Sequence, residues 1–252
     1  SKLKLNDDKT EALLIHSQKT ALSSSFPSTV HVGTSDIQFS PSARNLGYIL
    51  SSDLSIDKHI LHTCRSAYTA LRQISSIRSY LTVSATKVLV CAFVLSRIDY
   101  CNSLLAGCPK HAIDKLQRIQ NSAARLVLRA KKRDHITPLL YSLHWLPVKA
   151  RIEYKLSVLC HNFFSDSCPV YLSALLSVYS PARNLRSSSD TRTLSIPRVR
   201  TKTFGERAFS FCGPKQWNSL PADIRSISNT DTFKKALKTY LFKLYYSDPV
   251  TG

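Results

Sequence analysis

The residues best placed to do chemistry in this sequence are two rows of basic side chains in its middle part. Each row advances by alternating steps of three and four residues, which puts its members on one face of a helix. The first row is Lys58, His62, Arg65, Thr69 and Arg72, and the second is Lys115, Arg118, Ser122, Arg125 and Arg129, extended by Lys131, Lys132 and Arg133. A line of cations can follow a nucleic-acid backbone and release its counterions, which gives affinity without a choice of sequence. We therefore predict nonspecific nucleic-acid contact through the lysines and arginines of both rows.

The alternative is that these rows are only the solvated faces of two amphipathic helices. Such faces usually carry both signs of charge, mixed along the helix. Here the first row has Asp57 at its start as the nearest acid, and the second has Asp114. This one-sided charge favours the nucleic-acid interpretation.

Catalytic and metal-binding patterns find little support. The six glycines are too far apart for a nucleotide-binding loop or a G-x-S-x-G elbow, and no glutamate follows a histidine as a zinc protease requires. Asp7 and Asp8 are adjacent carboxylates, as a two-metal site needs, but a turn or cap role fits them better. His59, His62 and Cys64 lie close in sequence, yet on a helix Cys64 points to the apolar face. We predict no catalytic residue and no metal ligand in this chain.

The cysteines and the lengths of the apolar runs indicate the cellular compartment in which the protein is expected. The chain has seven cysteines, an odd number, and no C-x-x-C pair, which is typical of reduced thiols in the core of an intracellular protein. The longest apolar run, residues 88–95, is far shorter than the roughly 20 residues of a membrane span. We therefore expect an intracellular protein, in the nucleus or the cytoplasm, that is not secreted and has no membrane partner.

The net charge of the chain is unevenly distributed. The 252 residues include 35 Lys and Arg against 16 Asp and Glu, a formal charge of +19. Residues 1–55 carry five basic and five acidic side chains, whereas residues 56–145 carry 14 and 4, and residues 146–252 carry 16 and 7. All of the excess therefore lies after residue 55, where it favours a polyanionic partner.

The hydrophobic period changes at the same point. Before residue 55 we expect short strands and polar loops, with strands at 37–39 and 46–50. After it, apolar residues recur at steps of three and four from Ile56 to Ile74, which indicates a helix. Residues 82–105 are apolar nearly all round, so we expect a helix buried in a bundle. Further helices are expected after Pro109, at 148–164 and at 231–246. The fold class that follows is mainly α, with a small β-containing N-terminal part.

These shifts divide the chain into three expected parts. They are residues 1–55 with strands, 56–145 with a helical bundle, and 146–252 with a second helical region and a basic linker at about 180–203.

Both tryptophans, Trp145 and Trp217, are flanked by leucine and proline. They can stack on bases or anchor the core, and we favour the core.

Several motifs, in this order along the chain, resemble those of reverse transcriptases from non-LTR (LINE-type) retrotransposons, in particular the jockey-like branch. The motifs are Lys4-Leu5-Asn6 with Asp8-Lys9-Thr10-Glu11, Asn45-Leu46-Gly47, Ser96-Arg97-Ile98-Asp99-Tyr100-Cys101-Asn102-Ser103-Leu104-Leu105, Leu116-Gln117-Arg118-Ile119-Gln120-Asn121-Ser122-Ala123-Ala124-Arg125-Leu126, Leu143-His144-Trp145-Leu146-Pro147, Trp217-Asn218-Ser219-Leu220-Pro221 and Phe233-Lys234-Lys235-Ala236-Leu237-Lys238. The likeness spans nearly the whole chain.

The resemblance implies a piece of an RNA-directed DNA polymerase that lacks the chemistry. In the family the catalytic aspartates precede the first of these motifs and hold two divalent metals, magnesium being expected. We therefore expect no enzyme activity and no cofactor in this chain itself. Residues 1–55 would be the end of the palm, with Leu46, Gly47 and Tyr48 in a primer-grip-like hairpin, and 56–145 would be the helical thumb.

The expected partners follow from the same resemblance. They are RNA or an RNA–DNA duplex, and the upstream palm and fingers of a full-length polymerase, with the complex present as a ribonucleoprotein. The chain contains no methionine and starts at Ser1, so we expect a fragment or a trimmed chain. Two alternatives stay open: a free-standing nonspecific nucleic-acid-binding module, and a helical interaction protein without nucleic-acid function.

Overall fold

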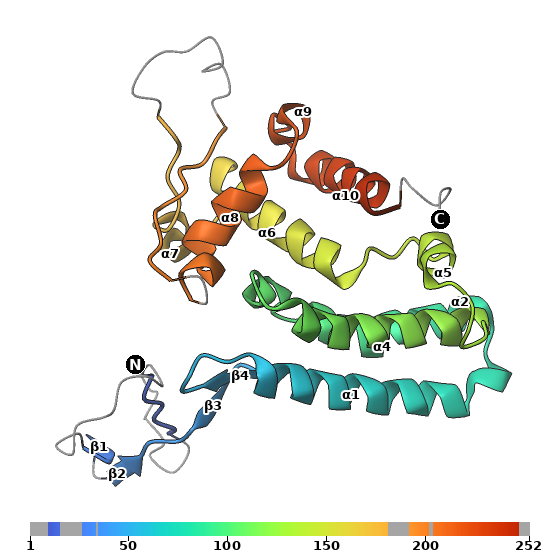
Figure 1. The fold of residues 1–252 in the computed structure, drawn as a ribbon, viewed down its shortest axis with the longest axis horizontal. Coiled ribbons are helices and arrows are strands. Elements are labelled where there is room, and N and C mark those ends of the chain that lie inside the picture. The colour runs from blue at the N-terminus through green and yellow to red at the C-terminus, as the bar shows by residue number, and fades with distance from the viewer. Residues whose placement is uncertain (1–9, 16–26, 34, 181–191, 202–203, 247–252) are drawn as a thin grey trace, which may run out of the picture. The chain divides into compact units, whose positions relative to one another are not determined.

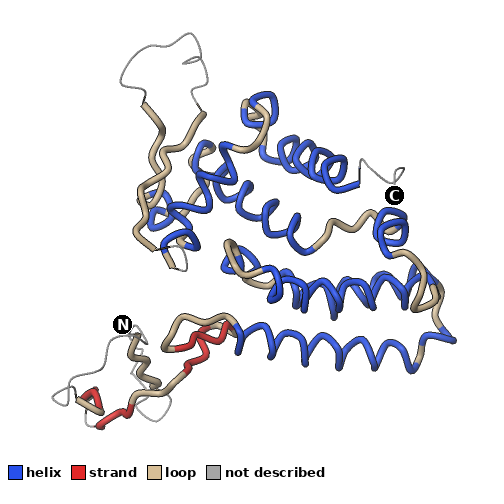
Figure 2. Tube along the Cα trace, in the orientation of Figure 1, coloured by secondary structure: helices blue, strands red, loops and turns tan. Residues whose placement is uncertain are grey.

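The structure is a computed structural model that describes residues 10–15, 27–33, 35–180, 192–201 and 204–246 (Figure 1). The chain divides into two units, Ser1–Arg65 and Ser66–Gly252, which we take in turn. Helices dominate, and two small antiparallel sheets lie near the N-terminus (Figure 2). The mainly α fold with a small β-containing N-terminal part is thus confirmed. The predicted borders after residues 55 and 145 stay predictions.

The first unit holds two hairpins. β1 (Thr29–Val32) pairs with β2 (Ser35–Gln38), and β3 (Ser42–Asn45) pairs with β4 (Tyr48–Ser51), both antiparallel. The second hairpin turns through Leu46 at φ 47° and Gly47 at φ 91°. A two-residue turn with both φ values positive matches the twist of the flanking strands. The strand expected at 46–50 therefore begins two residues later, because its first two residues form the turn. The Asp7–Asp8 pair lies outside the described residues.

Helix α1 (Asp57–Ser76) starts in the first unit and continues into the second. The Ser55 hydroxyl accepts a hydrogen bond from the Asp57 amide at 3.2 Å, which pairs one of the free N–H groups at the helix start. On its apolar face Ile60, Leu71 and Ile74 are buried. The helical period expected from residue 56 onward is present.

The second unit continues with a long interrupted helix. It comprises α2 (Val83–Val90), the π-helical turn η3 (Cys91–Leu95) and α3 (Ser96–Asp99), followed by the 3₁₀ turn η4 (Asn102–Leu105). The helix expected over residues 82–105 and buried in a bundle is buried on one side only, and it ends at Asp99. Val88 is 64% exposed and Phe93 51%, while residues on the other faces are buried. Apolar side chains favour burial. Which faces of a helix are buried depends on the elements that pack against it.

Two further helices complete this half of the unit. α4 (Lys110–Leu128) buries Leu116, Ile119 and Val127. It packs against α2, η3 and α5 (Ile136–Ser142). It also packs against the next helix along the chain, which covers residues 148–164. Within it, Gln120 is fully buried and donates to the backbone oxygen of Leu146 at 2.9 Å, so the polar residue on its inner face is paired.

The C-terminal half of the unit is built on α6 (Val148–Phe164), against which α8 (Phe209–Asn218) and α10 (Thr230–Tyr246) both pack (Figure 1). The short helices α7 (Val170–Ser173), η5 (Gly205–Arg207) and α9 (Ala222–Arg225) connect them. Trp217 and Phe233 are the largest fully buried side chains of this core.

Part of the region expected as a linker packs into this core. Residues 192–201 are described, and Leu194 among them is only 1% exposed. Asn218 holds Leu194 in both directions, accepting from its amide at 2.9 Å and donating to its carbonyl at 2.7 Å. The same stretch also pairs with residues 177–179 in a short antiparallel bridge, in which the Tyr179 amide donates to the Thr193 oxygen at 2.8 Å. The remaining linker residues, 181–191 and 202–203, lie outside the described residues.

Candidate nucleic-acid interface

A groove of about 420 Å³ runs between the second half of α1 and the C-terminal half of α4. Its lining residues belong to the second unit and are Tyr68, Leu71, Arg72, Ser75, Arg78, Ser122, Arg125, Leu126, Arg129 and Ala130. Four of them are arginines and none is an acid. The groove therefore brings together Arg72 from the first predicted row and Arg125 and Arg129 from the second.

Arg78 was not in either predicted row, and it is the residue that joins the two helices. Its side chain is 7% exposed, and the guanidinium donates to the backbone oxygens of Leu126 at 2.9 Å, Val127 at 2.8 Å and Leu81 at 2.8 Å. The first two are carbonyls of the last turn of α4, which have no partner within the helix. A cation at this end also interacts favourably with the helix dipole.

A sequence signal for Arg78 existed. It falls four residues after Ile74, so it continues the buried face of α1 beyond the end of that helix. A cation at an apolar position is seldom solvated freely and usually finds backbone or acidic partners. The partner itself, in α4, could not be read from the sequence, because it lies 48 residues away.

Arg125 and Arg129 are held by backbone oxygens and not by carboxylates. The Arg125 guanidinium donates to the oxygen of Asp134 at 3.1 Å, and its Nε atom is buried with no hydrogen-bond partner in the described structure. Arg129 ends α4 in the left-handed conformation, at φ 52°, and donates to the oxygen of Arg78 at 3.4 Å. Neutral carbonyls orient these side chains without cancelling their charge, so the groove keeps a positive potential.

The other predicted cations of the second unit are exposed. Arg72 donates to the Thr69 hydroxyl at 3.4 Å, and Lys115 and Arg118 lie on the outer face of α4. Lys131, Lys132 and Arg133 are exposed in the loop after α4. That loop also holds a carboxylate, since Asp134 accepts from the Lys131 amide at 2.7 Å. The second row therefore runs along one exposed face and ends at the groove.

Lys58 and Arg65 belong to the first unit, so the first row is divided between the units. The Lys58 ammonium donates to the Ser42 hydroxyl at 3.2 Å and to the Pro41 oxygen at 3.5 Å. It therefore ties the start of α1 to the entry of β3. Arg65 is exposed on α1.

The predicted primer-grip-like residues lie at the tip of the β3–β4 hairpin. Leu46 is 88% exposed, and the Tyr48 ring packs against the His59 ring, tilted by 31° with the ring centroids 4.0 Å apart. Burial, with a smaller effect of the nearby His62, lowers the pKa of His59. His59 is thus neutral at pH 7 and acts as a packing partner. The primer-grip role of Leu46, Gly47 and Tyr48 stays a prediction.

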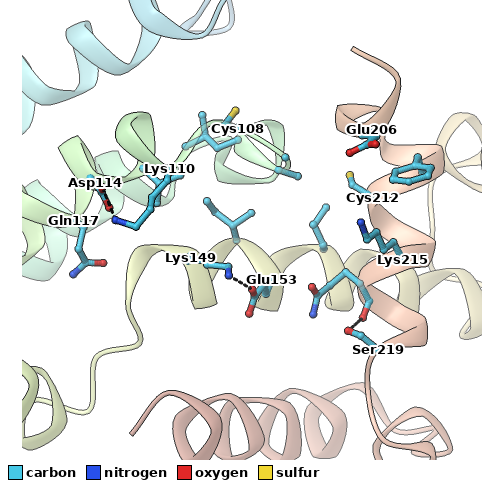
Figure 3. A pocket seen from close by; sticks show the side chains of 18 residues that line it. Cys108, Lys110, Asp114, Gln117, Lys149, Glu153, Glu206, Cys212, Lys215 and Ser219 are labelled. Carbon is cyan, nitrogen blue, oxygen red and sulfur yellow. Dashed lines mark hydrogen bonds and ion pairs between the residues drawn. The ribbon is translucent and has the colours of Figure 1, made fainter. Parts of the chain in front are cut away.

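A larger cavity, of about 640 Å³, lies between α4, α6 and α8 (Figure 3). Its walls are largely apolar, and several of the polar groups that line it have hydrogen-bond partners. The Ser219 hydroxyl donates to the backbone oxygen of Gln216 at 2.7 Å. The Glu153 carboxylate accepts a hydrogen bond at 2.9 Å from Tyr245, which is not a lining residue. Burial raises the pKa of Cys212 to about 11, so this thiol is protonated and a poor nucleophile at neutral pH. Histidine does not occur among the lining residues, and the Glu153 carboxylate that lies there is paired with Tyr245.

The two tryptophans belong to the core. Trp217 is fully buried and donates from Nε1 to the Arg192 oxygen at 2.6 Å, and Trp145 is 5% exposed. The Trp145 carbonyl accepts the Tyr246 hydroxyl at 2.5 Å. Neither ring presents a face to a base, so the core interpretation is confirmed.

Comparisons with known proteins found no match: no family model, no curated protein and no solved structure is similar to this chain. Within the described ranges, no group of three or more His, Cys, Asp or Glu is placed to hold a metal ion. The same part of the chain contains no helix long and apolar enough to cross a membrane.

Proposed function

We propose that this chain binds the phosphate backbone of a nucleic-acid duplex through the arginine groove between α1 and α4. One observation carries the proposal: Arg72, Arg78, Arg125 and Arg129 line a single groove that has no acid among its lining residues. The hydrogen bonds that position three of these guanidinium groups go to backbone oxygens. Their charge is thus left for an anionic partner.

Phosphate suits this groove better than carboxylate on a protein partner. Guanidinium stays charged at every physiological pH, and its planar fork of donors matches carboxylate and phosphate oxygens alike, so the choice depends on how the charges are arranged. The exposed cations Lys115 and Arg118 continue from the groove along α4. A line of several positive charges fits a polymer with regularly repeated phosphates better than a single anionic side chain.

The motifs described above extend the proposal to a biological setting. They favour a non-catalytic thumb-like part of a non-LTR retrotransposon RNA-directed DNA polymerase, with an RNA–DNA template–primer as the duplex. The polymerising chemistry would come from upstream palm and fingers with two divalent metals. Leu46, Gly47 and Tyr48 would then steady the primer end.

The salt dependence of duplex binding tests the proposal. We expect an RNA–DNA duplex to bind with an affinity that falls steeply between 50 and 200 mM salt, by about 10³-fold if about six phosphates are contacted. Fluorescence anisotropy of a labelled duplex measures it. A chain that shows no binding at the lower salt concentration is a helical interaction protein, and the proposal fails.

A further inference from the structure

Two extended segments of the second unit, residues 174–180 and 192–201, run side by side (Figure 1). They meet in an antiparallel bridge, in which Val178 lies opposite Leu194. The two hydrogen bonds of the bridge, both 2.8 Å long, are made by the residues on either side of this pair. Val178 and Leu194 are therefore a non-hydrogen-bonded pair, so the N–H and C=O groups of each point outward, away from the other strand.

The two outer edges of this bridge differ. On one side, the Asn218 side chain pairs both the N–H and the C=O group of Leu194, at 2.9 and 2.7 Å. On the other side, the N–H and C=O groups of Val178 have no hydrogen-bond partner within the described residues. In this part of the chain one edge is thus closed, and the other presents one donor and one acceptor on the same residue. An open edge of this kind is a template for pairing with another strand.

The side chains along the open edge are apolar and uncharged. Val178 and Tyr179 are about half exposed, and Val170 and Tyr171, on the preceding helix α7, are mostly exposed. The sequence from residue 167 to residue 182 contains no charged side chain, in a chain where one residue in five is charged. Natural edge strands are commonly protected from pairing by charged side chains, and this edge has no such protection. Exposed apolar surface next to an open edge is typical of a contact with another protein chain.

We infer that this edge pairs with the same edge of a second copy of the chain, in a dimer whose two-fold axis passes beside Val178. Across such an axis the Val178 N–H of each copy donates to the Val178 C=O of the other, so one pairing satisfies both open groups of both copies. The uncharged edge meets no like charge in its partner, and an edge without cations does not favour an acidic peptide or a nucleic acid. Since Asn218 already closes the far edge, the assembly ends at two copies.

Sedimentation equilibrium of the full chain tests the dimer. We expect the average mass to rise with protein concentration from 28.3 kDa towards twice that value and no further, over about 1 µM to about 1 mM, as for a small interface. A mass that stays at 28.3 kDa throughout overturns the inference, and so does growth beyond two copies.

The conditions of this measurement exclude other causes of association. A reductant prevents disulfide formation through Cys91, which is exposed. Treatment with nuclease removes nucleic acid that could bridge two chains. Salt at about 0.5 M screens the repulsion between two chains of the same net charge. Association that disappears under these conditions does not come from the edge, and it overturns the inference.

A charged side chain at the edge locates the contact. Val178→Lys places two like charges beside the two-fold axis, and we expect it to weaken dimerisation by at least about tenfold. Val83→Lys is the matched control, because Val83 on α2 is 49% exposed, the same fraction as Val178, and the variant adds the same charge. The control should dimerise as the wild type does. Equal effects of the two variants would show that the edge is not the contact, and the inference fails.

A second pair of variants tests the backbone pairing itself. Val178→Pro removes the outward N–H and leaves both bonds of the bridge, which the Tyr179 amide and the Ser177 oxygen make. Val178→Thr keeps the N–H and the β-branched shape. We expect the proline variant to dimerise at least about tenfold more weakly than the threonine variant, since both bonds across the axis are lost. Circular dichroism of the dilute proteins shows that both are folded. Equal dimerisation of the two variants would exclude pairing of the edges and overturn the inference.

Discussion

Trp217→Ala is expected to lower the free energy of unfolding of the second unit by about 3–5 kcal/mol, the range for removing a large buried aromatic ring. The indole is fully buried, and its ring centroid lies 5.3 Å from that of Phe164 and 5.7 Å from that of Phe233. It also holds residues 192–201 through its bond to the Arg192 oxygen. Alanine would leave a cavity and would remove the shorter of the two hydrogen bonds to this carbonyl, the other coming from Arg225 at 3.4 Å.

Urea denaturation followed by tryptophan fluorescence measures this loss, since Trp145 remains as a buried reporter. Trp217→Phe is the matched control, because it keeps most of the apolar volume and loses the N–H donor. We expect it to cost about 1–2 kcal/mol, the effect of one hydrogen bond and a small gap. An alanine variant within 1 kcal/mol of the wild type would show that the ring does not anchor this core.

Arg78→Met is expected to destabilise the second unit by about 3 kcal/mol, because it leaves three backbone carbonyls without their donor. Two of them, those of Leu126 and Val127, belong to the last turn of α4. The end of α4 should fray, and Arg125 and Arg129, which line the groove there, should lose their fixed positions. Duplex binding should therefore weaken as well as stability.

Arg72→Met is the control for this variant, since Arg72 lies exposed on α1, six residues earlier. We expect its stability to stay within 0.5 kcal/mol of the wild type, as is usual for an exposed side chain. Arg78→Lys should recover only part of the loss, because one ammonium group cannot reproduce the planar fork that reaches three oxygens. The outcome that contradicts the cap is equal stability of the Arg78 and Arg72 methionine variants, measured by urea denaturation and circular dichroism.

The fold class and much of the candidate site could be predicted because they depend on local periodicity. The step of three and four residues placed α1 and α4 and identified Arg72, Arg125 and Arg129 as members of two rows. The distance between the rows could not be predicted, because nothing in the spacing along one helix reports how it packs on another. The groove is a property of that packing, and so is the cap that Arg78 provides.

Other differences between the expected and the observed burial also result from packing between segments distant in sequence. Leu194 lies in a stretch rich in Ser, Thr and Arg that has no sustained period. Its backbone is paired by Asn218, 24 residues later, and by an antiparallel bridge to Val178. Conversely, Val88 and Phe93 sit in the most apolar stretch of the chain and are exposed. In each case a partner distant in sequence decides burial, and local composition indicates only a tendency.

The salt slope of duplex binding in two charge-matched variants tests the groove most directly. Arg72→Gln with Arg129→Asn removes two groove charges, and asparagine tolerates the left-handed conformation at position 129. Arg200→Gln with Lys235→Gln removes two exposed charges away from the groove. We expect the slope of log affinity against log salt to fall by about 2 in the groove variant, and to stay at the wild-type value in the other. Equal slopes in the two variants would contradict binding of the duplex in the groove.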